Sequence, residues 1–186
     1  MERFEGIKHL ANHIQNELLV SNLGPTSNEL WQTGHKDNFF YTYGAMGLVS
    51  SVALGMAIST DKKVIAFDGD GALVMNMGTI STIGRHQPKN LITIVWDNEE
   101  WGQTGHQPSH TSAGTDLEEV AKSCSIPKTA TVQSLENLEE IFLRALNEDG
   151  PWFIVAKVKE PTDKGPYVAP IEPEMTTFRV RNFINK

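Results

Sequence analysis

The sequence predicts an α/β fold: a three-layer, doubly wound parallel sheet with helices on both of its faces. Short apolar runs alternate along the chain with segments of helical periodicity, as in proteins built from strand–helix–strand units. Two of these runs, 64–67 and 91–96, are apolar on both sides, which is typical of strands that helices cover on both faces. The 186 residues suffice for one domain with a sizeable core and are too few for two ordinary domains.

Apolar runs bounded by turn-forming residues predict the strands. In chain order, the expected strands are 18–20, 39–41, 63–67, 91–96, 130–132 and 152–158. Apolar residues at helical spacing predict the helices that connect them. In chain order, the expected helices are 2–15, 25–32, 45–59, 72–85, 117–123 and 135–146.

Individual residues support several of these boundaries. Pro25 stands where a helix can begin, and Asp116 is a favourable N-cap for the helix that follows it. The segment 45–59 is rich in small residues, so we expect it to pack closely as a buried helix. The last helix has an acidic run that predicts a solvated face, formed by Glu136, Glu139 and Glu140.

We expect residues 1–159 to form the α/β domain and residues 160–186 to form a C-terminal arm. Prolines restrict the backbone of this last segment, so we expect an extended chain and not a separate domain. The prolines of the arm are Pro161, Pro166, Pro170 and Pro173.

Composition excludes several classes of protein. The net charge of −7 argues against general binding to nucleic acids or membranes. The lone Cys124 excludes an internal disulfide framework, a cysteine-ligated iron–sulfur cluster and a zinc finger. No signal peptide is visible, and the most apolar stretch, 48–58, is too short to span a bilayer. We therefore expect a soluble, cytoplasmic protein.

Polar residues follow two of the predicted strands. Asp70 lies just after 63–67, and Asn98 lies just after 91–96. Ligands of doubly wound sheets bind at the carboxyl ends of strands, so the two side chains converge if these strands are neighbours. The two residues are 28 positions apart, which matches the length of one helix plus one strand.

These side chains have the chemistry of a metal and phosphate site. Carboxylate and amide oxygens are suitable ligands for Mg²⁺. Proteins usually bind this ion together with a phosphate group that supplies further oxygen ligands. Gly71 and Ala72 open the following helix, whose free N–H groups favour an anion. The pattern predicts a pyrophosphate site that contains a divalent metal.

The segment from Gly69 to Asn98 resembles the diphosphate-binding signature of thiamine-diphosphate enzymes, a GDG followed about 25 residues later by an asparagine pair. Asp97 replaces the first asparagine of that pair. The segments 41–58 and 97–111 resemble the elements that precede and follow the signature in the same domain. Within this family the chain resembles the beta subunits of sulfopyruvate decarboxylase, and it also resembles phosphonopyruvate decarboxylase.

The resemblance assigns roles around the diphosphate. It implies that Asp70 and Asn98 bind Mg²⁺ with their side chains and that Glu100 does so with its backbone carbonyl. Gly69, Gly71 and Ala72 belong to the implied cofactor-binding set. Ala72 stands where many relatives have serine or threonine, so we expect backbone N–H groups alone to hold the diphosphate there.

Further roles concern the reacting part of the cofactor. The Gly44 carbonyl is expected to accept from the aminopyrimidine, and Met46 to force the cofactor into its bent shape. Bound in this way, thiamine diphosphate is the electron sink for decarboxylation. Thr104 and His106 are further catalytic candidates, and His110 is a weaker one. The alternative is that these loop residues only shape the site.

The resemblance also implies a partner. In the family, a glutamate from a pyrimidine-binding domain activates the cofactor, and no such domain fits before residue 21 or after residue 159. We therefore expect an alpha subunit that carries this domain and its glutamate, in a hetero-oligomer of dimeric alpha–beta units.

The implied function is that of the beta subunit of a 2-oxoacid decarboxylase, a carboxy-lyase. The favoured reaction converts sulfopyruvate to sulfoacetaldehyde and CO₂, a step linked in the family to coenzyme M biosynthesis. One alternative is the decarboxylation of phosphonopyruvate or another small anionic 2-oxoacid. The other is a noncatalytic subunit that retains the fold.

Overall fold

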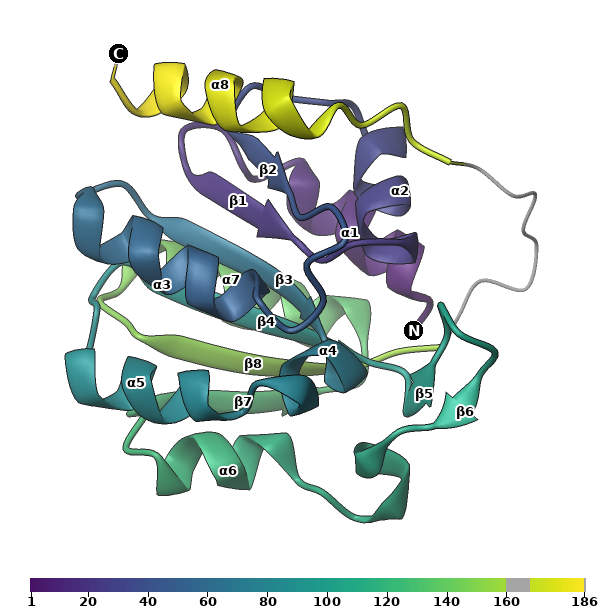
Figure 1. The fold of residues 1–186 in the computed structure, drawn as a ribbon. Coiled ribbons are helices and arrows are strands. Elements are labelled where there is room, and N and C mark those ends of the chain that lie inside the picture. Colours follow the sequence, from purple (N-terminus) through teal and green to yellow (C-terminus); the bar gives the residue numbers. More distant parts are fainter. Residues whose placement is uncertain (160–167, 186) are drawn as a thin grey trace.

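The computed structural model describes residues 1–159 and 168–185, and a parallel sheet lies at its centre (Figure 1). In these residues the sheet is six-stranded and has the order β2-β1-β3-β4-β8-β7. Its strands are β1 (Leu18–Ser21), β2 (Phe39–Tyr41), β3 (Val64–Gly69), β4 (Leu91–Asp97), β7 (Lys128–Val132) and β8 (Trp152–Lys157). All neighbouring pairs in this sheet are parallel, which confirms the predicted fold class.

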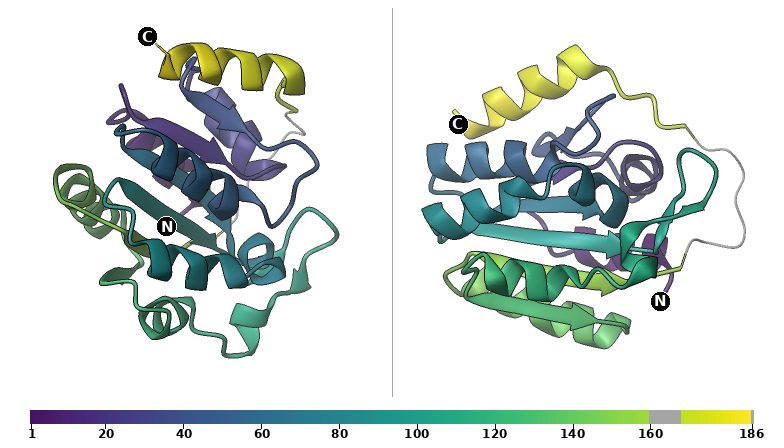
Figure 2. Two further views of the ribbon diagram at one scale, coloured as in Figure 1. Left: turned by 60° about the vertical axis from the view of Figure 1, so that its left-hand side comes forward. Right: turned by 60° about the horizontal axis from the view of Figure 1, so that its bottom comes forward.

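Helices cover both faces of the sheet, which therefore forms the middle of three layers (Figures 1 and 2). The helices on one face are α1 (Arg3–Ala11), α2 (Pro25–Gln32) and α7 (Leu135–Asn147). The helices on the other face are α3 (Val49–Ser59), α4 (Asp70–Met75), α5 (Gly78–His86) and α6 (Leu117–Ser123). None of the helices in the described ranges has the length and apolar character needed to span a membrane.

The alternation of side chains along β3 explains why both faces are apolar. Ile65 and Phe67 belong to the core beneath α1 and α7, whereas Val64 and Ala66 belong to the core beneath α3 and α5. Successive side chains of a strand point to opposite faces, so a strand between two helical layers needs apolar residues at every position.

The predicted helix 72–85 is wrong, because the structure divides this segment into α4 and α5. Asn76 ends α4 with a non-helical backbone, φ −143° and ψ 48°. Its side-chain amide donates to the Gly47 carbonyl and to Ser51 Oγ, each at 3.2 Å. These tertiary contacts stabilise the break, and the apolar periodicity alone did not reveal it.

The predicted helix 45–59 begins late, at Val49. Gly44 and Gly47 have positive φ values of 66° and 83°, and a right-handed helix cannot pass through such residues. The segment before α3 is therefore a loop, and it brings Met46 to the carboxyl edge of the sheet.

The expectation of an extended arm needs correction in its described part. Residues 173–184 form helix α8 (Pro173–Ile184), with Pro173 in the first turn, where its missing N–H costs no helical hydrogen bond. Val180 is buried, and Phe183 packs against the same core as α3 and α5. Residues 160–167 lie outside the described ranges, and the domain boundary at residue 159 stays a prediction.

Replacing Gly84 by alanine is expected to destabilise the protein by about 3 kcal/mol or more, because overpacking a rigid contact is costly. A Cβ at Gly84 in α5 would overlap the carbonyl oxygen of Cys124. Gly55 is the matched control, since it is helical and exposed and a Cβ there meets nothing within 4 Å. Gly55→Ala is expected to stabilise by about 1 kcal/mol. Denaturant unfolding measures both, and equal effects would contradict the packing argument.

Candidate active site

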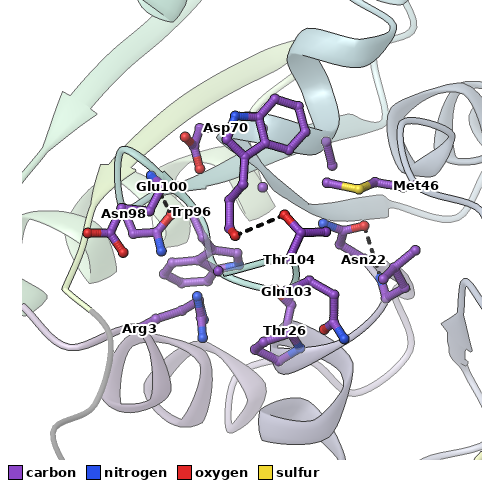
Figure 3. Close-up of a pocket in the computed structure, with 17 residues that line it drawn as sticks. Arg3, Asn22, Thr26, Met46, Asp70, Trp96, Asn98, Glu100, Gln103 and Thr104 are labelled. Atoms are coloured by element: carbon purple, nitrogen blue, oxygen red, sulfur yellow. Dashed lines mark hydrogen bonds between the residues drawn. The ribbon is translucent and has the colours of Figure 1, made fainter. Parts of the chain in front are cut away.

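A crevice lies between β1 and β3 at the carboxyl edge of the sheet. The chain leaves β1 toward β2 and leaves β3 toward β4, so the two connections diverge at this point. In doubly wound sheets, ligands bind where neighbouring connections diverge. The cavity found there is drawn in Figure 3. Residues that line it include Arg3, Asn22, Thr26, Met46, Asp70, Trp96, Asn98, Glu100 and Thr104.

A short hairpin covers one side of this cavity. Its strands are β5 (Glu100–Trp101) and β6 (Gln107–Pro108), and the 3₁₀ helix η1 (His110–Ala113) follows. The Trp101 indole packs on the first turn of α4, where a Cβ at Gly71 would lie 3.0 Å from Trp101 Cε3. Glycine is therefore the residue that fits between the hairpin and the start of α4.

Asp70 is the central acidic residue of the cavity. It is the first residue of α4 and is 2% exposed. Its carboxylate accepts hydrogen bonds from Ser109 Oγ and from Thr111 Oγ1, the latter at 3.2 Å. Burial raises the pKa of Asp70, the Ser109 hydrogen bond opposes this rise, and the nearby Asp97 carboxylate adds to it.

Asp97, at the end of β4, shares the Lys157 ammonium group with Glu99. Lys157 Nζ lies 2.7 Å from Asp97 Oδ2, and Thr111 Oγ1 donates to Asp97 Oδ1 at 2.8 Å. In the described part of the chain, no lysine, arginine or histidine lies within ion-pair distance of Asp70. A dehydrated carboxylate beside a second carboxylate favours a bound cation.

A comparison with known protein families identifies the domain. The family described as "Thiamine pyrophosphate enzyme, C-terminal TPP binding domain" matches residues 23–156. The chain belongs to the thiamine pyrophosphate enzymes. It therefore contains the domain that binds thiamine diphosphate, as the sequence predicted.

Individual relatives support the same assignment. The beta subunit of sulfopyruvate decarboxylase from Methanocaldococcus jannaschii is 44% identical over 84% of this chain and 83% of its own. A longer sulfopyruvate decarboxylase from Methanosarcina acetivorans is 38% identical over 100% of this chain but 48% of its own. Phosphonopyruvate decarboxylase from Streptomyces viridochromogenes is 34% identical over 94% of this chain and 44% of its own.

A solved structure shows the shared fold. Benzoylformate decarboxylase from Polynucleobacter necessarius superimposes with a TM-score of 0.71 at 22% identity. The matched region covers 89% of this chain and 34% of that chain. The fold of this domain is therefore one that also occurs as part of a larger chain.

The residues of the cavity fit a diphosphate with a divalent cation. Asp70, Asn98 and the backbone of Glu100 offer oxygen atoms, which hard cations prefer. The Asp70 carboxylate is buried, and no positively charged side chain among the described residues neutralises it, so it can bind such a cation.

The structure brings most of the predicted site residues together around the cavity. Those that line it are Met46, Gly69, Asp70, Gly71, Ala72, Asn98, Glu100 and Thr104. Gly44 lies two positions before Met46 and is not part of the lining. The roles that the resemblance assigns to these residues remain predictions.

Two loop histidines lie outside the cavity lining. The exposed ring of His106 has its Nδ1 2.8 Å from Glu100 Oε2. The ring of His110 meets that of Trp101 edge-on, with centroids 6.4 Å apart. Thr104, which does line the cavity, donates from its hydroxyl to Gln107 Oε1 at 2.9 Å.

Sequence reasoning missed two groups of functional candidates. Ser109 and Thr111 orient the Asp70 carboxylate, but hydroxyl residues in a loop have no distinctive spacing. Asn22 and Thr26 line the cavity from the segment after β1. The rule that ligands bind at the carboxyl ends of strands could have found this second pair, because β1 ends at the same edge as β3.

Replacing Asp68 by asparagine is expected to change how stability depends on pH. Burial raises the pKa of the Asp68 carboxyl from 3.8 to about 6. The unfolded chain releases this proton near pH 4, whereas the folded protein releases it near pH 6. The unfolding free energy of the native protein therefore falls as the pH rises from 4 to 6. Above pH 6 the cost is about 3 kcal/mol.

The amide oxygen introduced by Asp68→Asn can still accept from Ser50, whose hydroxyl donates to Asp68 Oδ2 at 2.7 Å in the native chain. Relative to the native protein, this variant should therefore gain about 2 kcal/mol of unfolding free energy between pH 4 and pH 7. Urea unfolding at the two pH values measures the gain. A difference between the two proteins that does not change with pH would refute the assigned pKa.

Proposed function

We propose that this chain is the cofactor-binding beta subunit of a thiamine-diphosphate-dependent 2-oxoacid decarboxylase, and that it converts sulfopyruvate to sulfoacetaldehyde and CO₂. The observation that carries the proposal is the buried carboxylate of Asp70, in a cavity that Asn98 and Glu100 also line. No positively charged side chain among the described residues pairs with it. The substrate is inferred from the relative at 44% identity, which is named a sulfopyruvate decarboxylase beta subunit.

The residues of this chain hold the cofactor in the proposal. Asp70 and Asn98 bind Mg²⁺ through side-chain oxygens, and Glu100 does so through its backbone carbonyl. Gly71 and Ala72 line the cavity at the first turn of α4, where their N–H groups can donate to the diphosphate. When bound, thiamine diphosphate supplies the electron sink for decarboxylation.

Other residues are proposed to orient the reacting groups. Met46 reaches the cavity from the loop before α3, and its bulk supports the cofactor from below in the proposal. The Gly44 carbonyl is the proposed acceptor for the aminopyrimidine. The Thr104 hydroxyl, which donates to Gln107 Oε1, can accept a hydrogen bond from a ligand in the cavity, and the exposed imidazole of His106 can hold a proton close to Glu100.

A partner subunit completes the site in this proposal. Large apolar side chains are exposed beside Met46, including Tyr43 at 70%, Leu48 at 45% and Met75 at 58%. Exposed apolar groups next to a cavity are typical of an interface. The Methanosarcina acetivorans relative is about twice as long as its match to this chain, so it has room for the pyrimidine-binding domain that we assign to an alpha subunit.

The substrate is tested with the complex of this chain and its alpha subunit, loaded with thiamine diphosphate and Mg²⁺. Sulfopyruvate, phosphonopyruvate and pyruvate are compared by CO₂ release and aldehyde formation. We expect kcat/KM to be at least about tenfold higher for sulfopyruvate than for pyruvate, since a site built for a charged group discriminates strongly against an analogue that lacks it. This preference would show that the site recognises the anionic group at C3 of the substrate. A higher kcat/KM for sulfopyruvate than for phosphonopyruvate is also expected from the proposed substrate.

Two other results would assign a different function. A preference for phosphonopyruvate would favour the activity of the relative at 34% identity. If no 2-oxoacid is decarboxylated and calorimetry detects no cofactor in the complex, the chain is a noncatalytic subunit that retains the fold.

A further inference from the structure

Two histidines and a glutamate meet on the surface where α1 and α7 pack together. His9 Nε2 lies 3.0 Å from Glu139 Oε2, and His13 Nε2 lies 2.7 Å from Glu139 Oε1. These side chains are partly buried, between 32% and 41% exposed. None of them lines the cavity described above. The sequence predicted that Glu139 lies on a solvated face of α7, but its carboxylate contacts the imidazoles of His9 and His13.

The backbone places both imidazoles on the same side of α1. His9 lies in the last turn of the helix, and His13 is four positions later, one helical turn away. His13 N donates to the Leu10 carbonyl at 3.0 Å, which extends the turn past the last helical residue. The two ring centroids are 6.2 Å apart.

The third side chain comes from a helix that is held close to α1. A Cβ at Gly6 of α1 would lie 2.8 Å from Trp96 Cζ3 and 3.4 Å from Leu138 Cδ2. Leu138 is fully buried, and it directly precedes Glu139. The tight packing at Gly6 therefore determines how near Glu139 comes to the histidines.

We propose that His9, His13 and Glu139 form a Zn²⁺ site with water as its fourth ligand. One ligand atom from each residue lies within 4.8 Å of the others. In tetrahedral zinc sites the bonds are about 2.0–2.2 Å long, which places neighbouring ligand atoms about 3.4 Å apart. The two nitrogen–oxygen distances of 3.0 and 2.7 Å are slightly shorter than this, so small side-chain rotations open the space for the ion.

The donor set selects the class of metal. Imidazole nitrogens and a carboxylate suit zinc and its neighbours in the transition series, whereas Mg²⁺ prefers oxygen ligands alone. A bound ion would cross-link α1 to α7.

The cross-link has a structural consequence at the other end of α1. Arg3 begins this helix, lines the cavity and forms a two-pronged ion pair with Glu29, at 2.9 and 2.8 Å. Fixing α1 against α7 would therefore also hold Arg3 in place. Zinc is expected to raise the thermal stability of the folded chain, because a ligand that binds only the folded state stabilises it.

The test is a zinc titration of the full chain, purified without a histidine tag and kept in excess Mg²⁺. We expect calorimetry to give one equivalent of Zn²⁺ per chain, and His9→Ala, His13→Ala and Glu139→Ala each to weaken binding by at least about tenfold. Loss of even an outer partner of a zinc ligand costs about 10- to 100-fold. His86→Ala is the matched control, because His86 is exposed at the end of α5.

A second measurement distinguishes the site from binding elsewhere. Zinc should raise the Tm of the native chain and of His86→Ala, and should leave the Tm of His13→Ala unchanged. The proposal is overturned if the chain takes up no zinc, or if His13→Ala binds zinc as the native chain does. Loss of binding in His106→Ala but not in His13→Ala would place the ion at the loop instead, and would equally overturn it.

Discussion

Replacing Asp70 by alanine is expected to abolish the binding of thiamine diphosphate and, with it, decarboxylation by the complex. Asp70 is buried, and no positively charged side chain among the described residues pairs with it. In our proposal its carboxylate is the charged ligand of Mg²⁺, so its removal leaves the diphosphate without its counter-ion. We expect at least about a 100-fold loss of affinity, which corresponds to about 3 kcal/mol. Calorimetry with thiamine diphosphate and Mg²⁺ measures it.

The matched control for Asp70→Ala is Asp68→Asn. Asp68 is two residues away and equally buried, but its carboxylate accepts from Ser50 and does not line the cavity. This control should bind the cofactor as the native chain does. Asp70→Asn tests the charge alone, because its amide oxygen can still accept from Ser109 and Thr111. Native affinity in Asp70→Ala, with unfolding transitions showing that the variant is folded, would refute the metal assignment.

The second large effect is that this chain alone should be inactive. With thiamine diphosphate, Mg²⁺ and sulfopyruvate but no alpha subunit, we expect less than about 1% of the rate of the complex. The reason is that general acid–base groups each contribute about 10²- to 10⁴-fold, and the proposed activating glutamate belongs to the partner. Steady-state CO₂ release with and without the alpha subunit measures the effect.

Two controls separate the glutamate from assembly as such. The longer Methanosarcina acetivorans relative, assayed under the same conditions, shows that the assay detects decarboxylation. An alpha subunit in which the activating glutamate is replaced by glutamine should still assemble with this chain but restore almost no activity. Turnover by this chain alone at the rate of the complex would overturn the two-subunit proposal.

The sequence was sufficient for the strands of the parallel sheet and for the core of the candidate site, but it did not predict the hairpin of β5 and β6. The doubly apolar runs of β3 and β4 could only be strands between two helical layers, and they are neighbours. Asp70 and Asn98 follow these strands, so they had to reach the same edge, and both line the cavity. Local sequence predicts residues of this kind, because the direction of a parallel strand decides at which edge of the sheet the residues after it lie.

Features that depend on contacts between distant segments were not predictable. The break between α4 and α5 is stabilised by the bonds of Asn76 to Gly47 and Ser51. Helix α8 packs its Val180 against the core that α3 and α5 also cover, whereas the prolines of the C-terminal arm favoured an extended segment. In each case the deciding partner lies far away along the chain, where no local pattern can indicate it.

The sequence by itself determined the parallel sheet, the family and the residues around the proposed diphosphate site, since periodicity and short motifs encode strand direction and turn chemistry. Only the tertiary structure decided which charged side chains are paired. It paired Asp97 with Lys157, surrounded Asp70 with hydroxyls from the loop after β6 and joined His9 and His13 to Glu139. Burial and the distances between charges depend on packing across the whole chain, and local sequence does not encode them.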